Sequence, residues 1–131
     1  MTSLIHVLVS ASLLAGCATA APKEPLLPLT TTLAPAAAVP FGAATLVYQG
    51  AVDSRCPKFV MCIRAGEIAY PFILKGPAGT ESFNLTHAAP VHAASTVRGL
   101  LVTLVKAPEP PVGLASAPQP VIAVNVTLSR P

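Results

Sequence analysis

Apolar and polar residues alternate along several short stretches of the second half of the chain, and this alternation predicts β-strands. The clearest stretch is residues 121–129, VIAVNVTLS, where every second side chain is a large aliphatic one. Successive side chains of a strand point to opposite faces, so this stretch predicts a half-buried strand. Residues 97–106 alternate in a similar way, with an outer face that is also partly apolar. Three shorter strands are predicted over residues 45–49, 67–75 and 81–86.

Glycine and proline mark the connections between these strands. Gly76-Pro77-Ala78-Gly79 is typical of a turn, which predicts a hairpin between residues 67–75 and 81–86. Pro71 cannot donate a ladder hydrogen bond, so its strand is expected at a sheet edge or at a bulge. With five or six strands and long proline-rich connections, residues 45–131 are predicted to form an all-β domain, either a small antiparallel sandwich or a partly closed barrel.

The segment before this domain is rich in proline and alanine. Five prolines fall within residues 17–44, at Pro22, Pro25, Pro28, Pro35 and Pro40. Such a composition favours an extended, semi-rigid tether. The alternative is a strand-like segment packed on the domain, because LLPL and VPF are apolar enough to be buried.

The N-terminus has the features of an export signal. Residues 4–15 form an apolar run, which fits a signal peptide and is too short to cross a bilayer of about 30 Å as a helix. The run ends in Leu14-Ala15-Gly16-Cys17, which resembles the lipobox of bacterial lipoproteins. The resemblance implies that residues 1–16 are removed and that Cys17 carries a diacylglyceryl group and an N-acyl chain such as palmitate. The alternative is an ordinary secretory leader cleaved within residues 18–21.

The resemblance also implies a location. A lipidated Cys17 anchors the protein to a membrane of the bacterial cell envelope, and Ala18 at the next position is compatible with passage to the outer membrane, facing the periplasm. Two acyl groups or more are what stable attachment requires. The membrane is therefore the first expected partner, and another envelope protein is the second.

Composition excludes several classes of function. The 131 residues suffice for one domain, and 8 Lys and Arg against 5 Asp and Glu are scattered without a basic cluster, which argues against a nucleic-acid partner. No nucleophile elbow or phosphate-binding glycine loop is present, so no catalytic residue and no cofactor are predicted, and the protein is not expected to be an enzyme.

The three cysteines call for an explanation, because an exported protein seldom keeps an odd thiol. With Cys17 assigned to the lipid anchor, Cys56 and Cys62 remain in an oxidising compartment, and a disulfide between them is expected. A bridge closing so short a loop stabilises a fold by about 2 kcal/mol.

The sequence around this pair, DSRCPKFVMCIRAGE over residues 53–67, is similar to a motif of small exported bacterial β-proteins that have no assigned activity. The motif runs Asp-Ser-Arg-Cys-Pro, a short variable stretch, Val-x-Cys, an aliphatic residue, Trp, Ala and Gly. This chain departs from it at Arg64, where the motif has Trp, and at Phe59, which is expected to supply the lost apolar surface.

Each polar residue of the motif has an expected structural task in a disulfide-closed corner. Asp53 or Ser54 is expected to cap local backbone donors, Arg55 to reach a carbonyl or a carboxylate, and Gly66 to let the next strand begin.

Three functions are compatible with these features. The first is a non-enzymatic envelope lipoprotein that binds or packs against another component through a strand edge or through the disulfide-closed corner. The second is a soft-metal lipoprotein for copper or zinc, with ligands drawn from Cys56, Met61, Cys62, His87 and His92. The third is an inhibitor that inserts the closed loop into an envelope hydrolase.

Overall fold

The computed structural model describes residues 16–17 and 26–131, and the described part of the chain forms two antiparallel sheets and no helix. The first sheet has the strand order β1-β9-β8-β7, with β1 (Leu29–Leu33), β9 (Val124–Ser129), β8 (Leu101–Lys106) and β7 (Val91–Ala93). The second has the order β2-β3-β5-β4 with β6 also paired to β5, and contains β2 (Ala38–Phe41), β3 (Ala44–Tyr48), β4 (Val52–Asp53), β5 (Ile68–Gly76) and β6 (Gly79–Leu85).

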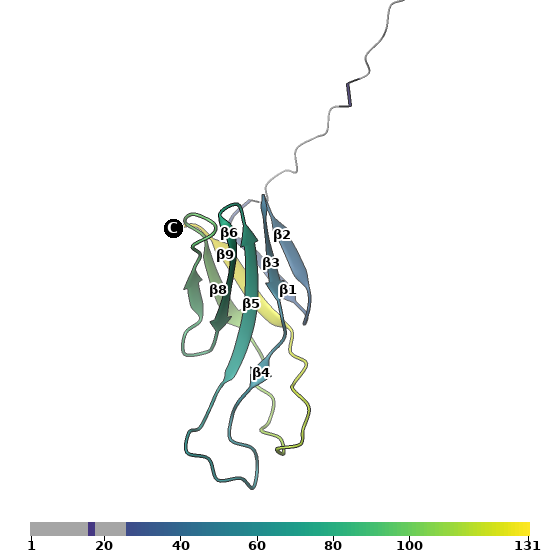
Figure 1. Ribbon diagram of the computed structural model, residues 1–131, viewed down its shortest axis with the longest axis vertical. Helices are drawn as coiled ribbons and strands as arrows, with labels where there is room; N and C mark the ends of the chain where they lie inside the picture. The colour runs from purple at the N-terminus through teal and green to yellow at the C-terminus, as the bar shows by residue number, and fades with distance from the viewer. Residues whose placement is uncertain (1–15, 18–25) are drawn as a thin grey trace, which may run out of the picture.

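The two sheets lie face to face, with β5 and β6 in front of β8 and β9 (Figure 1). Their facing side chains form one apolar core, in which the most buried large residues are Tyr48, Tyr70, Phe72, Leu46, Leu74, Leu85, Leu100, Leu128, Val102, Val124 and Val126. Most of these residues occupy alternate positions of their strands, as the period of a strand requires. The sheets do not close into a barrel, so the fold is an all-β sandwich.

The strands predicted from alternation are present. The hairpin of β5 and β6 closes at Gly76 opposite Gly79, as predicted. The last two strands start later than predicted, at Leu101 and Val124, because the residues before them turn or follow proline. The alternation therefore located each strand correctly. Apolar residues just before β8 and β9 made these two strands appear longer in the sequence than they are.

The predicted tether to residue 44 is wrong from Leu29 onward, and the alternative of a strand-like segment packed on the domain is confirmed, because this segment contributes strands to both sheets. β1 pairs with β9 along its whole length, and β2 pairs with β3. The inward side chains Leu33 and Phe41 are 3% and 2% exposed, so their burial stabilises the two strands. Pro40 is tolerated because β2 is an edge strand. The β domain therefore begins before residue 45, while residues 1–15 and 18–25 lie outside the described residues.

Pro71 does not make β5 an edge strand, since β5 pairs with β3 and β4 on one side and with β6 on the other. The alternative of a bulge is confirmed. Tyr48 pairs with Phe72, and Val52 pairs with Ala69. The segment opposite β5 therefore needs four residues to cover the distance that β5 covers with three. The extra residue interrupts the ladder beside Pro71, whose carbonyl accepts a hydrogen bond of 2.9 Å from the Gln49 N–H.

A carboxylate joins the two sheets at one edge of the sandwich. Glu81 of β6 accepts hydrogen bonds from the backbone N–H and the hydroxyl of both Ser95 and Thr96, at 2.7 to 2.9 Å. The Nε2 atom of His92, on β7, lies 3.1 Å from the same carboxylate, and its ring stacks on Phe83 with 3.8 Å between centroids. Burial would raise the pKa of Glu81, but these hydrogen bonds outweigh it and lower the pKa to about 2.

The two ends of the sandwich differ in their loops. The β5–β6 turn and the C-terminus lie at one end, and the long β4–β5 and β8–β9 connections extend from the other (Figure 1). Leu29 pairs with Leu128, near the end of β9, so β1 starts at the end that carries the C-terminus. Among residues 16–17 and 26–131 no helix has the length and apolarity to span a membrane.

Candidate binding site at the stapled loop

The connection between β4 and β5, residues 54–66, is closed by a disulfide between Cys56 and Cys62, as the sequence predicted. We call it the stapled loop. Its two cysteine Cα atoms are 5.8 Å apart. The strand pairing continues into its base, where the N–H groups of Ser54 and Cys56 each donate a hydrogen bond of 2.9 Å, to the carbonyls of Glu67 and Ala65 respectively. The loop therefore extends directly from the sheet.

An ion pair fixes the start of the loop. The guanidinium of Arg55 donates two hydrogen bonds to the Asp53 carboxylate, at 2.9 and 2.7 Å, and a third of 2.8 Å to the Pro110 carbonyl. Asp53 also accepts the Arg55 backbone N–H at 3.0 Å. The hydrogen bonds from the Arg55 side chain hold the pKa of Asp53 below its ordinary value, although burial opposes them. The tasks predicted for Asp53 and Arg55 are confirmed.

The other arm of the loop returns through Gly66, whose φ is +68°. A Cβ atom at this position would overlap the Ser54 carbonyl oxygen, so the two arms approach as closely as they do only because Gly66 has no side chain. The Ser54 hydroxyl donates to the Glu67 carbonyl at 2.9 Å. The close approach therefore requires glycine at position 66 of this chain.

A second loop supports the first. Residues 107–123, which we call the proline-rich loop, lie beside the stapled loop at the same end of the sandwich (Figure 1). The Lys58 N–H donates to the Gly113 carbonyl at 2.9 Å, and the Asp53 N–H donates to the Gln119 Oε1 atom at 2.7 Å. A small open hollow of about 180 Å³ is lined mainly by the proline-rich loop and, on one side, by Asp53, Arg55 and Pro57. The stapled loop is thus braced along one side.

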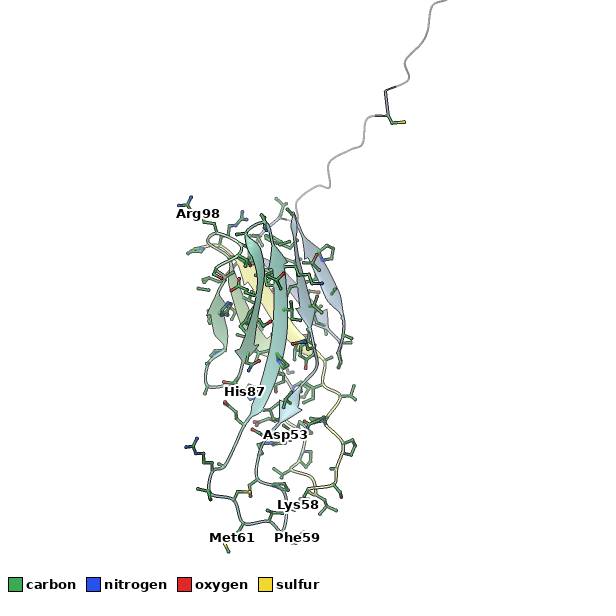
Figure 2. The ribbon with its side chains drawn as sticks, viewed as in Figure 1. Asp53, Lys58, Phe59, Met61, His87 and Arg98 are labelled. Carbon is green, nitrogen blue, oxygen red and sulfur yellow. A yellow bond between two sulfur atoms is a disulfide. The ribbon has the colours of Figure 1, made fainter. Side chains whose placement is uncertain are left out.

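The tip of the stapled loop is apolar and faces solvent. Phe59, Met61 and Ile63 are 96%, 99% and 104% exposed, and Val60 is 46% exposed. Figure 2 shows Phe59 and Met61 at the extreme end of the molecule, opposite the end that carries Arg98. We call these four residues the apolar tip. Large exposed apolar side chains that adjoin one another mark an interaction site more often than isolated ones do.

Phe59 does not supply core surface, so that prediction is wrong. Its φ of +64° is unusual for an aromatic residue and turns the chain at the tip, which directs the ring away from the sandwich. Arg64, at the tryptophan position of the motif, is exposed as well. The position therefore faces solvent in this chain, and the sequence signal for the site was the apolar run VMCI placed inside an otherwise polar loop.

Cations surround the apolar tip. Lys58 and Arg64 are both on the loop and both exposed, and the stapled loop itself contains no Asp or Glu. The third cation of the loop, Arg55, is paired with Asp53 at its base. No ion pair involves Lys58 or Arg64 within the part of the chain that the structure describes. The tip therefore combines apolar side chains with an unbalanced positive charge.

The residues considered as metal ligands are in different places. Cys56 and Cys62 are bonded to each other, and Met61 extends into solvent at the tip. His87 lies beside Ala107 and Glu109, with its Nδ1 atom 3.5 Å from the glutamate, and His92 lies against Glu81. Residues 16–17 and 26–131 contain no group of three or more His, Cys, Asp or Glu side chains suited to a metal ion.

Comparisons with protein-family models, with curated proteins and with solved structures gave no match.

Proposed function

We propose that the protein is a non-enzymatic, lipid-anchored binding module of the bacterial cell envelope, which holds a second envelope component through the apolar tip of its stapled loop. The observation that carries this proposal is the tip itself, with three large apolar side chains almost fully exposed on a loop that is closed by a disulfide. A soluble domain of this size normally buries such residues or uses them for contact.

The arrangement of the chain supports the proposal. β1, the first strand after the lipobox-like segment, starts at the end of the sandwich opposite the stapled loop (Figure 1). An anchor at Cys17 would hold that end nearer the membrane and leave the tip directed away from it. The disulfide and the proline-rich loop reduce the conformational freedom of the tip, so less entropy is lost when it binds.

The anchor is tested by the intact mass of the membrane-extracted protein, measured with and without reduction and thiol alkylation. We expect a chain that begins at Cys17 and carries the added mass of a diacylglyceryl and an N-acyl group. Alkylation should modify two cysteines, and only after reduction. A mass that begins within residues 18–21 without acyl groups would show that the leader is an ordinary secretory one.

The binding role is tested by photo-crosslinking in cells, with a photoreactive amino acid in place of Met61. We expect an adduct at this position, because its side chain is 99% exposed at the centre of the proposed contact. Val105, a 58% exposed aliphatic residue on β8, is the matched control position and should give no adduct. Absence of any adduct at position 61, or equal adducts at both positions, would contradict the proposed role.

A further inference from the structure

We propose that the component bound by the apolar tip is an anionic lipid surface, into which Phe59, Met61 and Ile63 insert while Lys58 and Arg64 contact the lipid headgroups. This inference rests on the proposed binding role of the stapled loop and names its partner. The contact is separate from the lipid anchor, because it is made by folded residues at the other end of the sandwich.

The tip has the shape and chemistry of an interfacial insertion. Its side chains form the end of a protruding loop rather than the floor of a groove (Figure 2). Segments that lie in a membrane interface bury their apolar face about 5–10 Å deep, at the boundary of headgroups and acyl chains. The tip offers one exposed aromatic and three aliphatic or thioether side chains for such an insertion, and none of the four carries a charge.

Charge favours a lipid surface that is anionic. Lys58 precedes the apolar tip and Arg64 follows it, so both cations flank the segment that would insert. Long cationic side chains can keep their charge at the headgroups while their aliphatic stems accompany the apolar residues. The stapled loop contains no carboxylate that the headgroups would repel. Of the two carboxylates that flank it, Asp53 is neutralised by Arg55, and Glu67 lies at the base of the loop, where its backbone pairs with Ser54.

A protein pocket is less well matched by the same residues. Protein interfaces usually add polar contacts in fixed positions to their apolar anchors. Phe59, Val60, Met61 and Ile63 offer no strong side-chain donor or acceptor, and the two cations beside them have no ion-pair partner that holds them in place in the described chain. A fluid lipid surface can be bound by apolar side chains and cations without hydrogen bonds in fixed directions.

The test uses tryptophan fluorescence, since the chain has no tryptophan of its own. The processed protein carrying Phe59→Trp is held in phosphatidylcholine vesicles by its anchor, or added free if it carries none. It is then titrated with second vesicles that contain phosphatidylglycerol and brominated lipid. We expect a blue shift and quenching of the emission, because the indole leaves water and meets the bromine atoms of the second vesicles.

Two sets of variants sharpen the result. Val105→Trp places the reporter on an exposed strand position and should show neither shift nor quenching. Adding Lys58→Gln or Arg64→Gln to Phe59→Trp should raise the lipid concentration at half-maximal shift roughly fivefold for each cation removed, since one basic residue near an anionic surface contributes about 1 kcal/mol.

Unchanged emission of the Phe59→Trp protein in the presence of phosphatidylglycerol vesicles would overturn the inference, as would an equal response to vesicles of phosphatidylcholine alone. The photo-crosslinking result separates this failure from that of the binding role. A protein adduct at position 61 with no response of the Phe59→Trp protein would overturn the lipid partner and leave the binding role standing. No adduct and no response would overturn both.

Discussion

Replacing Gly66 with alanine is expected to destabilise the protein by about 3 kcal/mol or more, because the new side chain meets both a strained backbone and a steric overlap. The φ of +68° alone disfavours any residue with a Cβ atom. The Cβ would also overlap the Ser54 carbonyl oxygen and lie 2.9 Å from the Arg55 nitrogen. These are backbone atoms, so the two arms of the stapled loop must separate. Urea unfolding followed by circular dichroism measures the loss.

The chain offers a matched control at Gly99. Its φ is +69°, nearly identical to that of Gly66, but a Cβ there would meet no atom within 4 Å. Gly99→Ala therefore isolates the backbone strain, which costs about 1–2 kcal/mol. If Gly66→Ala and Gly99→Ala lower the free energy of unfolding equally, the result would contradict the steric overlap with Ser54.

Replacing Glu81 with glutamine is expected to lower the free energy of unfolding at neutral pH by roughly 3 kcal/mol, the value that corresponds to a pKa held near 2 instead of 4.5. The Glu81 side chain is only 13% exposed, so solvent screens its hydrogen bonds weakly. Glutamine keeps the shape of the side chain but directs an NH₂ group at donors from Ser95, Thr96 or His92, which leaves at least one of them unsatisfied.

The pH dependence of this effect has a definite sign. The pKa of Glu81 in the folded protein lies below its ordinary value of 4.5, so the carboxylate contributes its full stability above about pH 4.5. That contribution is lost as the pH falls from about 4.5 toward 2. The difference between the parent protein and Glu81→Gln should therefore be constant near neutral pH and shrink across this window. Unfolding measured at a series of pH values checks it.

Glu109→Gln is the control for Glu81→Gln. Glu109 is 56% exposed and lies 3.5 Å from His87, so its removal should change stability by less than about 1 kcal/mol. A difference between Glu81→Gln and the parent protein that stays unchanged down to about pH 2 would show that the effect comes from packing and not from the carboxylate charge.

The strands could be predicted from the sequence because a strand buried on one face leaves a local mark. In β9, Val124, Val126 and Leu128 alternate with polar residues, and each is nearly inaccessible in the folded chain. The same reasoning located the β5–β6 hairpin from its glycine and proline turn. These features need only neighbours in sequence, so they can be recognised without knowing the rest of the fold.

β1 and β2 were predicted only as the alternative to a tether, because the pairing that holds this segment is not local. Leu29–Leu33 contains three threonines, alternates weakly, and pairs with β9, near the other end of the chain. Prolines on either side lend the segment the composition of a tether. This run becomes a strand because it pairs with the free edge of β9. The composition of the run does not reveal that such an edge is available.

The stapled loop combines features that the sequence predicted with features that only the tertiary structure determined. From the sequence alone, the roles of Asp53 and Arg55 and the all-β class could be predicted, because they follow from turn chemistry and from local alternation. The pairing of Cys56 with Cys62 was predicted by assigning the third cysteine, Cys17, to a lipid anchor. The close approach of Gly66 to Ser54 became visible only in the folded chain. The tertiary structure decided that Phe59 faces solvent instead of the core. Whether an apolar side chain is buried depends on what the rest of the chain places over it, and here the proline-rich loop braces the side of the stapled loop while the apolar tip is left exposed.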